Sequence, residues 1–373
     1  MKPEAGDRRS RGIVLAIVLV MIFALITAVY TFQRRAIIDT SIAGNRLRTT
    51  EAEALARGGL RIAEAIVYLT RLKAEAGQES GGAAALASLL GDGAGAMDDF
   101  WAMLGDFPLE LDGGRTLRIE IHDEGARLNL NALVEPTADE GEVAADEEAE
   151  QYLVQVLEYI IDGIDAPPEQ KLYDARAIAR NLLDYMDADD VSRDGRAEDG
   201  YYRAQDPPYR ARNGPFLTFD EIGLVEGVDP RLLRAMRDYI TIHPIGAREG
   251  IHLNRAEPWV LSVVFSGVSG DRELLRPNTV RDLWRLRQED KLVCDDPSVD
   301  PERCVPPSEI GSGELAEGSI YPETSLPAEP SVFRVVAEAT VGSLTRRLEA
   351  VYDTRPLEGP QLLSWRRLRG PDS

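Results

Sequence analysis

The stretch that decides the fold lies near the start of the chain, where Arg11-Gly12 is followed by IVLAIVLVMIFALITAVYTF, residues 13–32. Only Thr27 and Thr31 interrupt this apolar and aromatic run, and no charged residue falls within it. A helix of this length, at ~1.5 Å per residue, matches a hydrocarbon core of roughly 30 Å. The run is too long for the apolar part of a removable signal peptide, and no small-x-small cleavage signal ends it. We therefore expect a retained transmembrane helix over 13–32.

Charges on either side of this run set its orientation. The basic residues before it, which favour a cytoplasmic N-terminus, are Arg8, Arg9 and Arg11. Arg34 and Arg35 follow on the far side and weaken this preference. Segment 1–12 carries four bases and two acids, so the remaining chain is even more acidic than the net charge of −22 suggests. An acidic body is easier to translocate than a basic one, which agrees with export. A plain single-pass anchor is the alternative interpretation of these features.

Composition narrows the classes of function. The chain has 373 residues, with 42 Lys and Arg against 64 Asp and Glu, and an apolar fraction of 44% is enough to bury a core. Binding of nucleic acid needs a basic face, which this charge balance opposes. Three His and two Cys leave little material for a transition-metal site or a catalytic triad. The composition points away from an enzyme and toward an assembly part, with a hard cation as the candidate ligand.

The helix is expected to continue beyond the membrane. No proline occurs between Pro3 and Pro108, and the chain to about Ala76 is rich in helix-forming residues. Gly58 and Gly59 cost about 1 kcal/mol each relative to Ala and are candidate bend points. Apolar residues recur on an approximate helical stripe at Ile37, Ile38, Ile42, Ala56, Leu60, Ala63, Val67 and Leu72. We predict one spine helix from 13 to about 76.

Strand patterns occur far apart in the chain. Residues 117–122 alternate between apolar and polar side chains, as in a half-buried strand. Residues 332–341 and 344–352 flank Gly342-Ser343 and predict a β-hairpin with a two-residue turn. The simplest packing joins them in one small antiparallel sheet on the spine helix. This predicts an α+β core from 33–133 and 330–355, a large insertion at 134–329 and a C-terminal tail at 356–373.

The insertion is predicted to be mostly helical. It opens with an acidic run at 135–150, which we interpret as a solvated loop. Two amphipathic helices follow, with apolar faces formed by Leu153, Val156, Leu157, Ile160, Ile161 and Ile164, and by Ala175, Ile178, Ala179, Leu182, Leu183 and Met186. Helix starts are predicted at the capping box Thr218–Glu221 and at Asp229-Pro230, and Asn131 and Asn254 are candidate N-caps. The segment Gly267–Gly270 faintly resembles a helix-hairpin-helix, which we interpret as a packing hairpin without DNA binding.

Several blocks together resemble the minor pseudopilin K family of the type II secretion system. The Arg11-Gly12 junction with Ile13 resembles a prepilin-peptidase site, cleaved after the glycine. The other blocks, in the family's order, are Asp123–Asn131, Leu182–Tyr202, Asn213–Phe216, Glu221, Leu224–Gly227 and Leu253–Ala256, followed by the hairpin. Ile17 stands at the fifth mature position, where most pilin-like proteins carry Glu. Its presence fits the one pseudopilin that typically lacks that carboxylate.

The resemblance implies a specific architecture and role. The expected fold is a pilin-like α+β core with a large inserted all-α domain. The processing residues are Gly12 and Ile13, after which the new N-terminus is methylated. The resemblance places the protein in the bacterial inner membrane as a single-pass subunit with a periplasmic head, at the tip of a short pseudopilus. Its expected partners are prepilin peptidase and other minor pseudopilins, and no nucleic acid.

An acidic cluster is the candidate metal site. Its carboxylates, which would repel one another unless a divalent cation bridged them, are Asp187, Asp189, Asp190, Asp194, Glu198 and Asp199. Asp190, Ser192, Asp194 and Gly195 match the first half of an EF-hand loop, but Tyr201 occupies the position of the bidentate Glu, so this is not an EF-hand. The family resemblance favours calcium here. A solvated Asp-rich turn is the alternative.

Cysteines, histidines and aromatic residues allow further predictions. Cys294 and Cys304 enclose nine residues and predict one local disulfide outside the cytoplasm, with two free thiols as the alternative. No nucleophile motif lies near the histidines, which we interpret as surface or capping residues: His122, His243 and His252. Four aromatic residues predict local core rather than a contact surface: Tyr201, Tyr202, Tyr209 and Phe216.

Three functional hypotheses remain from the sequence. The first is a tip pseudopilin that supports pseudopilus assembly and export across the outer membrane. The second is a membrane-tethered, calcium-binding receptor or adhesin without a pseudopilus. The third, a membrane-anchored DNA-uptake protein, rests only on the hairpin resemblance and is opposed by the acidic charge.

Overall fold

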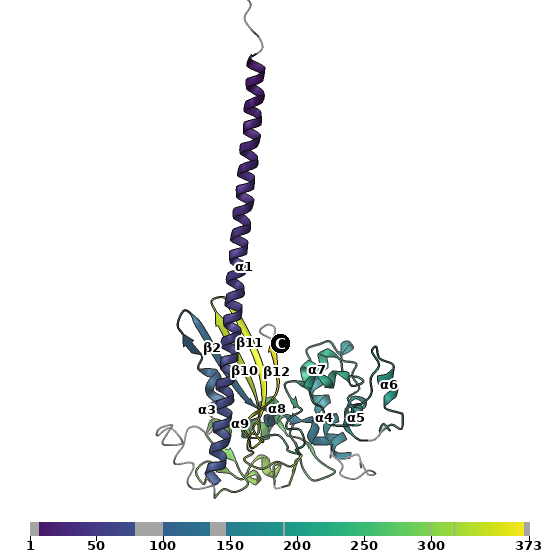
Figure 1. The fold of residues 1–373 in the computed structure, drawn as a ribbon. Helices are drawn as coiled ribbons and strands as arrows, with labels where there is room; N and C mark the ends of the chain where they lie inside the picture. Colours follow the sequence, from purple (N-terminus) through teal and green to yellow (C-terminus); the bar gives the residue numbers. More distant parts are fainter. Residues whose placement is uncertain are drawn as a thin grey trace, which may run out of the picture.

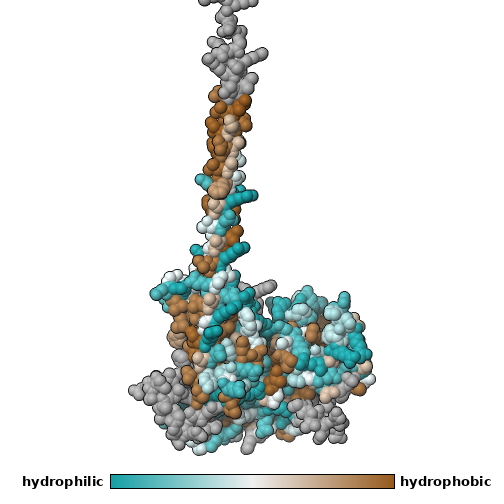
Figure 2. All heavy atoms as spheres, in the orientation of Figure 1, coloured by the Kyte–Doolittle hydropathy of each residue, from teal (hydrophilic) through white to brown (hydrophobic). Residues whose placement is uncertain are grey.

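The computed structural model describes residues 7–78, 100–134, 147–188, 191–298, 300–316 and 318–368. Its dominant element is helix α1 (Asp7–Gln78), which projects far beyond the rest of the molecule (Figure 1). The predicted spine helix is therefore confirmed, and it continues without a break through Gly58 and Gly59. Figure 2 shows hydrophobic side chains along the upper described part of the projecting helix and polar side chains among them farther down, whereas polar side chains cover much of the body below.

The second half of α1 packs on a five-stranded antiparallel sheet with the order β1-β2-β10-β11-β12. Its strands are β1 (Leu109–Leu111), β2 (Arg115–Asp123), β10 (Val332–Val341), β11 (Leu344–Asp353) and β12 (Gln361–Leu368). The predicted hairpin forms across Gly342, whose φ of 63° is in the left-handed region that glycine tolerates. β10 pairs with β2 as predicted, bringing Ala337 opposite Ile119 although more than half of the chain separates them.

Small side chains allow the helix to approach the sheet closely. Ala56 and Ala63 are fully buried on α1, against Leu117 and Ile119 of β2 and their neighbours. A Cβ atom at Gly59 would lie 2.9 Å from the Leu117 side chain and 3.2 Å from the Ala337 Cβ. Gly59 is thus a contact residue rather than a bend. At the lower end of the helix, Trp101 of α3 (Phe100–Met103) packs edge-on against Phe333 at 5.2 Å between ring centroids.

Both edges of the sheet differ from the prediction. The segment 356–373 was expected to be a tail, but residues 361–368 form β12, which pairs along β11 with one irregularity at Val351/Tyr352. The sequence QLLSWRRL does not alternate, since a bulge interrupts the two-residue period and most of this strand's side chains are exposed. All three residues of strand β1 are exposed, so it carries no alternation that could be recognised.

The chain between β2 and β10 forms the insertion, whose core is separate from that of the sheet. In the described residues its regular structure is mainly helical, in α4 (Glu147–Gly163), α5 (Ala175–Met186), α6 (Asp199–Arg203), α7 (Pro230–Met236), α8 (Pro258–Leu261) and α9 (Pro277–Gln288). Two-residue strands link these helices: β3 (Leu128–Asn129), β4 (Ile240–Thr241), β5 (Phe265–Ser266), β6 (Glu273–Leu274), β7 (Leu292–Val293), β8 (Cys304–Val305) and β9 (Ile320–Tyr321). The apolar faces predicted for α4 and α5 are buried, and these two helices pack together.

Helix starts in the insertion were predicted with mixed success. Asp229 caps α7 as expected, accepting the backbone N–H groups of Arg231 at 2.9 Å and Leu232 at 2.7 Å. The capping box at Thr218 is wrong, because Thr218 makes no side-chain cap bond and Phe219–Leu224 is a 3-10 helix. Glu221 instead accepts the Leu217 N–H at 2.9 Å. The segment around Gly267–Gly270 is a turn between β5 and β6, not a pair of helices.

The two asparagines proposed as N-caps hold distant backbone together instead. The Asn131 amide donates to the Ile242 carbonyl at 2.8 Å, and its oxygen accepts the Phe216 N–H at 2.8 Å. Asn254 makes the same pair of bonds with the N–H and carbonyl of Val293, at 2.8 and 2.9 Å. Each amide satisfies buried backbone groups in place of a strand neighbour. Asn131 and Asn254 therefore share a bridging role in place of the predicted helix cap.

Candidate functional site

The projecting half of α1 has the properties of a membrane span. It is the one helix in the described part of the chain long and apolar enough to cross a membrane, with a mean hydropathy of 2.7 in its most apolar window and none of that window buried. Both polar residues are satisfied within the helix, since Thr27 donates to the Phe23 carbonyl at 2.8 Å and Thr31 to the Ala28 carbonyl at 2.9 Å. Both threonine hydroxyls of the span therefore have a backbone acceptor in the helix itself, which suits them to hydrocarbon.

The predicted processing residues lie at the beginning of this helix. Gly12 and Ile13 fall within the first two turns of α1. Ile17 is 55% exposed and lies on the helix surface without a neighbour from the body of the protein. Packing against other transmembrane helices is therefore open to this entire half of α1.

The predicted metal-site residues that the structure describes each lie beside an arginine or are buried. Asp194 pairs with the Arg196 guanidinium at 2.5 Å, and its hydrogen bonds to Ser192 and to the Arg196 N–H lower the pKa of Asp194 to about 2. Asp199 pairs with Arg203 at 2.6 Å, and Arg210 lies 3.8 Å away. An antiparallel bridge between Val191 and Ala197 closes this part of the loop.

Deeper in the same loop, carboxylates are buried. Asp187 and Glu198 are 5% and 8% exposed, and neighbouring Asp184 is 4% exposed. Arg193 compensates two of these charges, at 3.0 Å from Asp184 and 3.7 Å from Asp187. Such an oxygen-rich donor set suits a hard cation. Asp189 and Asp190 lie outside the residues that the structure describes. Within the described residues, no group of three or more His, Cys, Asp or Glu side chains is close enough to hold a metal ion. Calcium binding thus stays a prediction.

The disulfide prediction is confirmed. Cys294 and Cys304 are bonded, with 5.6 Å between their Cα atoms. They lie at the ends of the parallel pair β7 and β8, whose register places Leu292 opposite Cys304. Asp295 then binds the Leu326 backbone in both directions, at 2.7 and 2.8 Å. The disulfide and the Asp295 hydrogen bonds together hold this loop of the insertion close to the point where the chain returns to the sheet.

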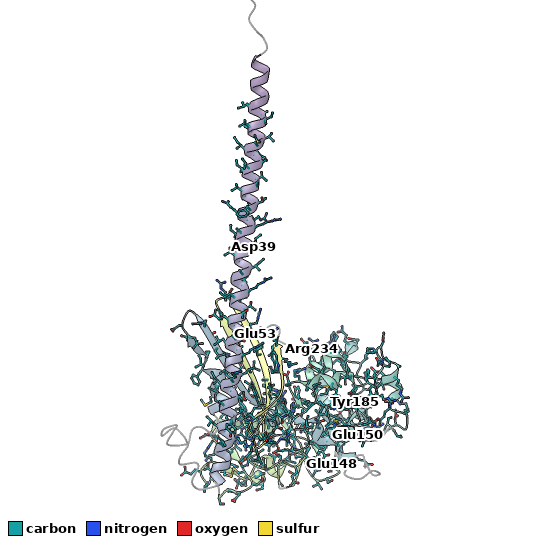
Figure 3. All side chains as sticks on the ribbon, viewed as in Figure 1. Asp39, Glu53, Glu148, Glu150, Tyr185 and Arg234 are labelled. Carbon is teal, nitrogen blue, oxygen red and sulfur yellow. A yellow bond between two sulfur atoms is a disulfide. The ribbon has the colours of Figure 1, made fainter. Side chains whose placement is uncertain are left out.

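Tyr202, Tyr209 and Phe216 form local core, as expected, whereas Tyr201 is 36% exposed, so the prediction is wrong for that residue. Tyr185 stacks on Phe216 at 5.2 Å and contacts Tyr202 edge-on at 5.6 Å, and Tyr202 in turn lies 5.5 Å from Tyr209. Burial of these rings raises the pKa of Tyr185 to about 12. This cluster lies between α5 and α6 and holds the two ends of the acidic loop together. Figure 3 places Tyr185 well inside the insertion.

Two buried ionic contacts were not recognised in the sequence. His252 is 2% exposed, and its Nδ1 lies 2.6 Å from the Asp123 carboxylate, with Glu249 3.4 Å from its other nitrogen. Burial would lower the pKa of His252, but Asp123 and Glu249 outweigh it and raise the value to about 9. The prediction of a surface or capping histidine is wrong for His252 and also for His243, which is 7% exposed. A Cβ atom at Gly125 would collide with the His252 imidazole ring, so a residue with a side chain does not fit at this position.

The second contact centres on Glu124, which is 3% exposed. It pairs with Arg127, lies 3.4 Å from Arg334 of β10 and accepts the Thr241 hydroxyl. Burial alone would raise the pKa of Glu124, but the two guanidinium groups and the hydroxyl lower it to about 2. Together with the Asp123 pair, this contact fixes the insertion to the end of β2. The adjacent acids Asp123 and Glu124 at a strand end were the only sequence signal.

Comparisons with known proteins agree with this architecture. A family model described as type II secretion system (T2SS), protein K matches residues 126–245. A curated relative, the putative type II secretion system protein K of Escherichia coli strain K12, is 26% identical over 148 residues, which cover 40% of this chain. The chain therefore spans less than half of that relative, at 42% of its length.

A solved structure matches most of the chain. It is the crystal structure of the GspK-GspI-GspJ complex from the enterotoxigenic E. coli type 2 secretion system. The match covers 87% of this chain and 99% of the other, with a TM-score of 0.51 and 17% identity, which shows the fold. Among the blocks that carried the resemblance in the sequence, the family match contains Leu182–Tyr202, Asn213–Phe216, Glu221 and Leu224–Gly227. Over residues 126–245 the chain is therefore similar to the type II secretion system protein K family, and it shares the fold of this solved structure.

Proposed function

We propose that the protein is a minor pseudopilin at the tip of a type II secretion pseudopilus, where it supports assembly and protein export across the outer membrane. The observation that carries the proposal is the division of α1. Its first half is apolar and exposed to lateral contacts, whereas its second half is packed on the sheet. A helix built in this way anchors a subunit in the membrane first and can pack inside a filament afterwards.

The residues at the helix start support processing and a tip position. Cleavage between Gly12 and Ile13, followed by methylation, would leave the apolar helix as the mature N-terminus. Ile17 provides no carboxylate to pair with the terminal amine of a subunit above it. A subunit without that acceptor fits the end of a filament better than its middle. Its partners would be other minor pseudopilins, which join the protein K homologue in the complex of the structural relative.

The location follows from the charges and the disulfide. The basic residues before the helix favour a cytoplasmic leader, which puts the acidic head in the periplasm of an inner-membrane protein. The bond between Cys294 and Cys304 supports this placement, because disulfides persist in oxidising compartments. A structural subunit also agrees with a chain that has only three His and two Cys.

Sequencing of the mature N-terminus, together with co-purification, tests the role. A pseudopilin should begin at Ile13 and recover two further minor pseudopilins from membranes of its own cells. Gly12→Leu should block cleavage and leave Met1 or the intact leader, whereas Gly58→Ala, which lies in open space on the same helix, should be processed normally. A tethered receptor would retain its leader and recover no pseudopilin, and that pair of results would reject the proposal.

We also propose that the acidic loop binds calcium, with ligands from Asp187, Asp189, Asp190, Asp194, Glu198 and Asp199. Support comes from three buried carboxylates, Asp184, Asp187 and Glu198, because Arg193 supplies only one positive charge beside two of them and buried charges are costly to leave uncompensated. A ligand that binds only the folded state adds about 2.7 kcal/mol at a hundredfold excess over its Kd. Calcium would then hold the loop to α5 and α6.

Thermal unfolding of the full chain in detergent micelles tests calcium binding. Millimolar calcium should raise the melting temperature by several degrees, and magnesium by less, because its small octahedral shell fits this loop poorly. Asp187→Asn or Asp190→Ala should remove the calcium response, whereas Asp206→Asn, an exposed acid outside the loop, should keep it. If calcium and magnesium raised the melting temperature equally, or if both loop variants kept the full calcium response, the acidic loop would be a solvated turn without a calcium site.

A further inference from the structure

A charged cleft separates the sheet from the insertion. It has a volume of about 610 Å³, and its floor is the face of β10, β11 and β12 that points away from α1. Six arginines line it, against five acids, in a protein whose net charge is −22: Arg127, Arg234, Arg237, Arg334, Arg347 and Arg366. The cleft is therefore a locally cationic site on an acidic molecule.

The arginines that line the cleft differ in whether a carboxylate pairs with them. The buried Glu124 holds Arg127 and Arg334, and Glu349 holds Arg366 at 2.6 Å. Arg234 on α7 is exposed, and its guanidinium bonds only to the Pro230 carbonyl of its own helix, at 3.1 Å. In the described part of the chain no carboxylate pairs with it. Figure 3 places Arg234 between the sheet and the insertion, where it can meet an incoming acid.

The edge strand β12 borders this cleft. It pairs with β11 on one side, and no other described strand pairs with its other side, so a row of backbone donors and acceptors is open along eight residues. Figure 1 shows β12 on the side of the sheet that is nearest to α7. Leu362 and Trp365 are 49% and 50% exposed. Proteins usually protect such an edge by charge or covering, because it invites another strand.

The two faces of β12 specify the kind of strand that fits. The register with β11 puts Leu362 and Trp365 on the face with Tyr352 and Ala350, beside α1. Ser364 and Arg366 lie on the opposite face and line the cleft. A strand added to this edge would therefore gain from apolar side chains on the α1 face and acidic side chains on the cleft face, where Arg234 and Arg366 lie.

We propose that β12 and the cleft bind an extended acidic segment of a partner protein, which adds to the sheet as a sixth strand. Charge favours this occupant over a second copy of the chain. Two β12 strands placed edge to edge would bring the Arg366-Arg367 pairs of both copies to one small interface, which costs energy through like-charge repulsion. An alternating acidic strand would pair with the same residues favourably. The proposal goes beyond the pseudopilin role and does not depend on it.

Binding of designed peptides to the full chain in detergent micelles tests this site. The probe is a labelled, end-blocked octapeptide of alternating Val and Glu, compared with alternating Val and Lys and with a Val-Glu peptide that carries two central prolines. The first should bind and the other two should not, because strand addition needs both acids and free backbone N–H groups. Arg234→Glu should weaken binding about fivefold. Arg231→Glu, on the same helix but outside the cleft, should leave binding unchanged.

Hydrogen exchange distinguishes strand addition from simple charge attraction. The Val-Glu peptide should slow amide exchange in residues 361–368, whereas the opposite edge of the sheet, Leu109–Leu111, should exchange as before. Equal binding of the Val-Lys peptide, or binding without protection of 361–368, would overturn the proposal. Concentration-dependent dimers that protect 361–368 without any peptide would assign the edge to a second copy and overturn it as well. Loss of pseudopilin partners in cells would not affect any of these measurements.

Discussion

The buried pair of His252 and Asp123 makes stability depend on pH. The pKa of His252 is raised from 6.5 to about 9 in the folded protein, so the charged imidazole stabilises the fold. This contribution is fully present below pH 6.5 and is lost as the pH rises from 6.5 through about 9, at about 1.4 kcal/mol per unit of pKa shift. Burial lowers the pKa of His243 in the folded protein below its usual value of 6.5. The contribution of His243 to the pH dependence of stability therefore lies below pH 6.5.

Replacement of His252 tests this dependence. We expect the melting temperature of the wild-type chain to fall between pH 6.5 and 9, whereas His252→Gln should be less stable at pH 6 and nearly independent of pH over that range. His122→Gln is the matched control, because the His122 side chain is 46% exposed on β2. Parallel pH profiles for wild-type and His252→Gln would show that the pair contributes nothing.

The role of His252 could not be predicted because its partner is remote. Asp123 lies 129 residues earlier in the chain, and no local pattern marks an ion pair formed across a fold. Asn131 and Asn254 were misinterpreted for the same reason, since their bonds reach Ile242 and Val293. The aromatic cluster was easier, because Tyr202, Tyr209 and Phe216 are near neighbours in sequence.

Among the elements, the contact between α1 and the sheet depends on one glycine. A side chain at Gly59 must displace Leu117 and Ala337, whereas one at Gly58 meets open space. Gly59→Val should lower the free energy of unfolding by about 1–3 kcal/mol through overpacking. Gly58→Val introduces the same side chain where no atom lies within 4 Å of the added Cβ, and it should change the free energy of unfolding by less than about 0.5 kcal/mol. Chemical denaturation of both variants gives the comparison, and equal losses would mean that helix propensity alone is responsible.

Elements with strong periodicity were predictable, and elements without it were not. The spine helix, β2, the hairpin of β10 and β11, and the faces of α4 and α5 all carry a clear two-residue or helical repeat with one buried face. β12 has a bulge and mostly exposed side chains, so its sequence resembles a tail. The capping motif at Thr218 failed because the following segment forms a 3-10 helix, in which Glu221 turns back to the Leu217 backbone.

At the scale of the whole molecule, two separate hydrophobic cores are joined by polar contacts. One core lies between α1 and the sheet, and the other fills the insertion. Between them lie the Asp123 and Glu124 contacts, and Arg355 adds a link from the end of β11 to the Ile245 carbonyl at 3.3 Å. These directional hydrogen bonds and ion pairs, rather than buried apolar surface, fix the orientation of the insertion relative to the sheet. The insertion can therefore project from the membrane-anchored core in a defined direction.

The membrane half of α1 gives the sharpest test of position in a filament. A carboxylate placed at Ile17 enters hydrocarbon, at a cost of roughly 2–3 kcal/mol near mid-helix and less near the helix end. In the pilin-like proteins that this chain resembles, the N-terminal amine of a neighbouring subunit is expected to offset this cost for subunits within the filament. A tip subunit has no such amine above it, so Ile17→Glu should impair incorporation into the tip complex and reduce secretion. Ile17→Leu keeps the apolar surface and should behave as wild type. The measurements are recovery of partner pseudopilins from membranes and the amount of exported protein, and normal values of both for Ile17→Glu would argue against a tip position.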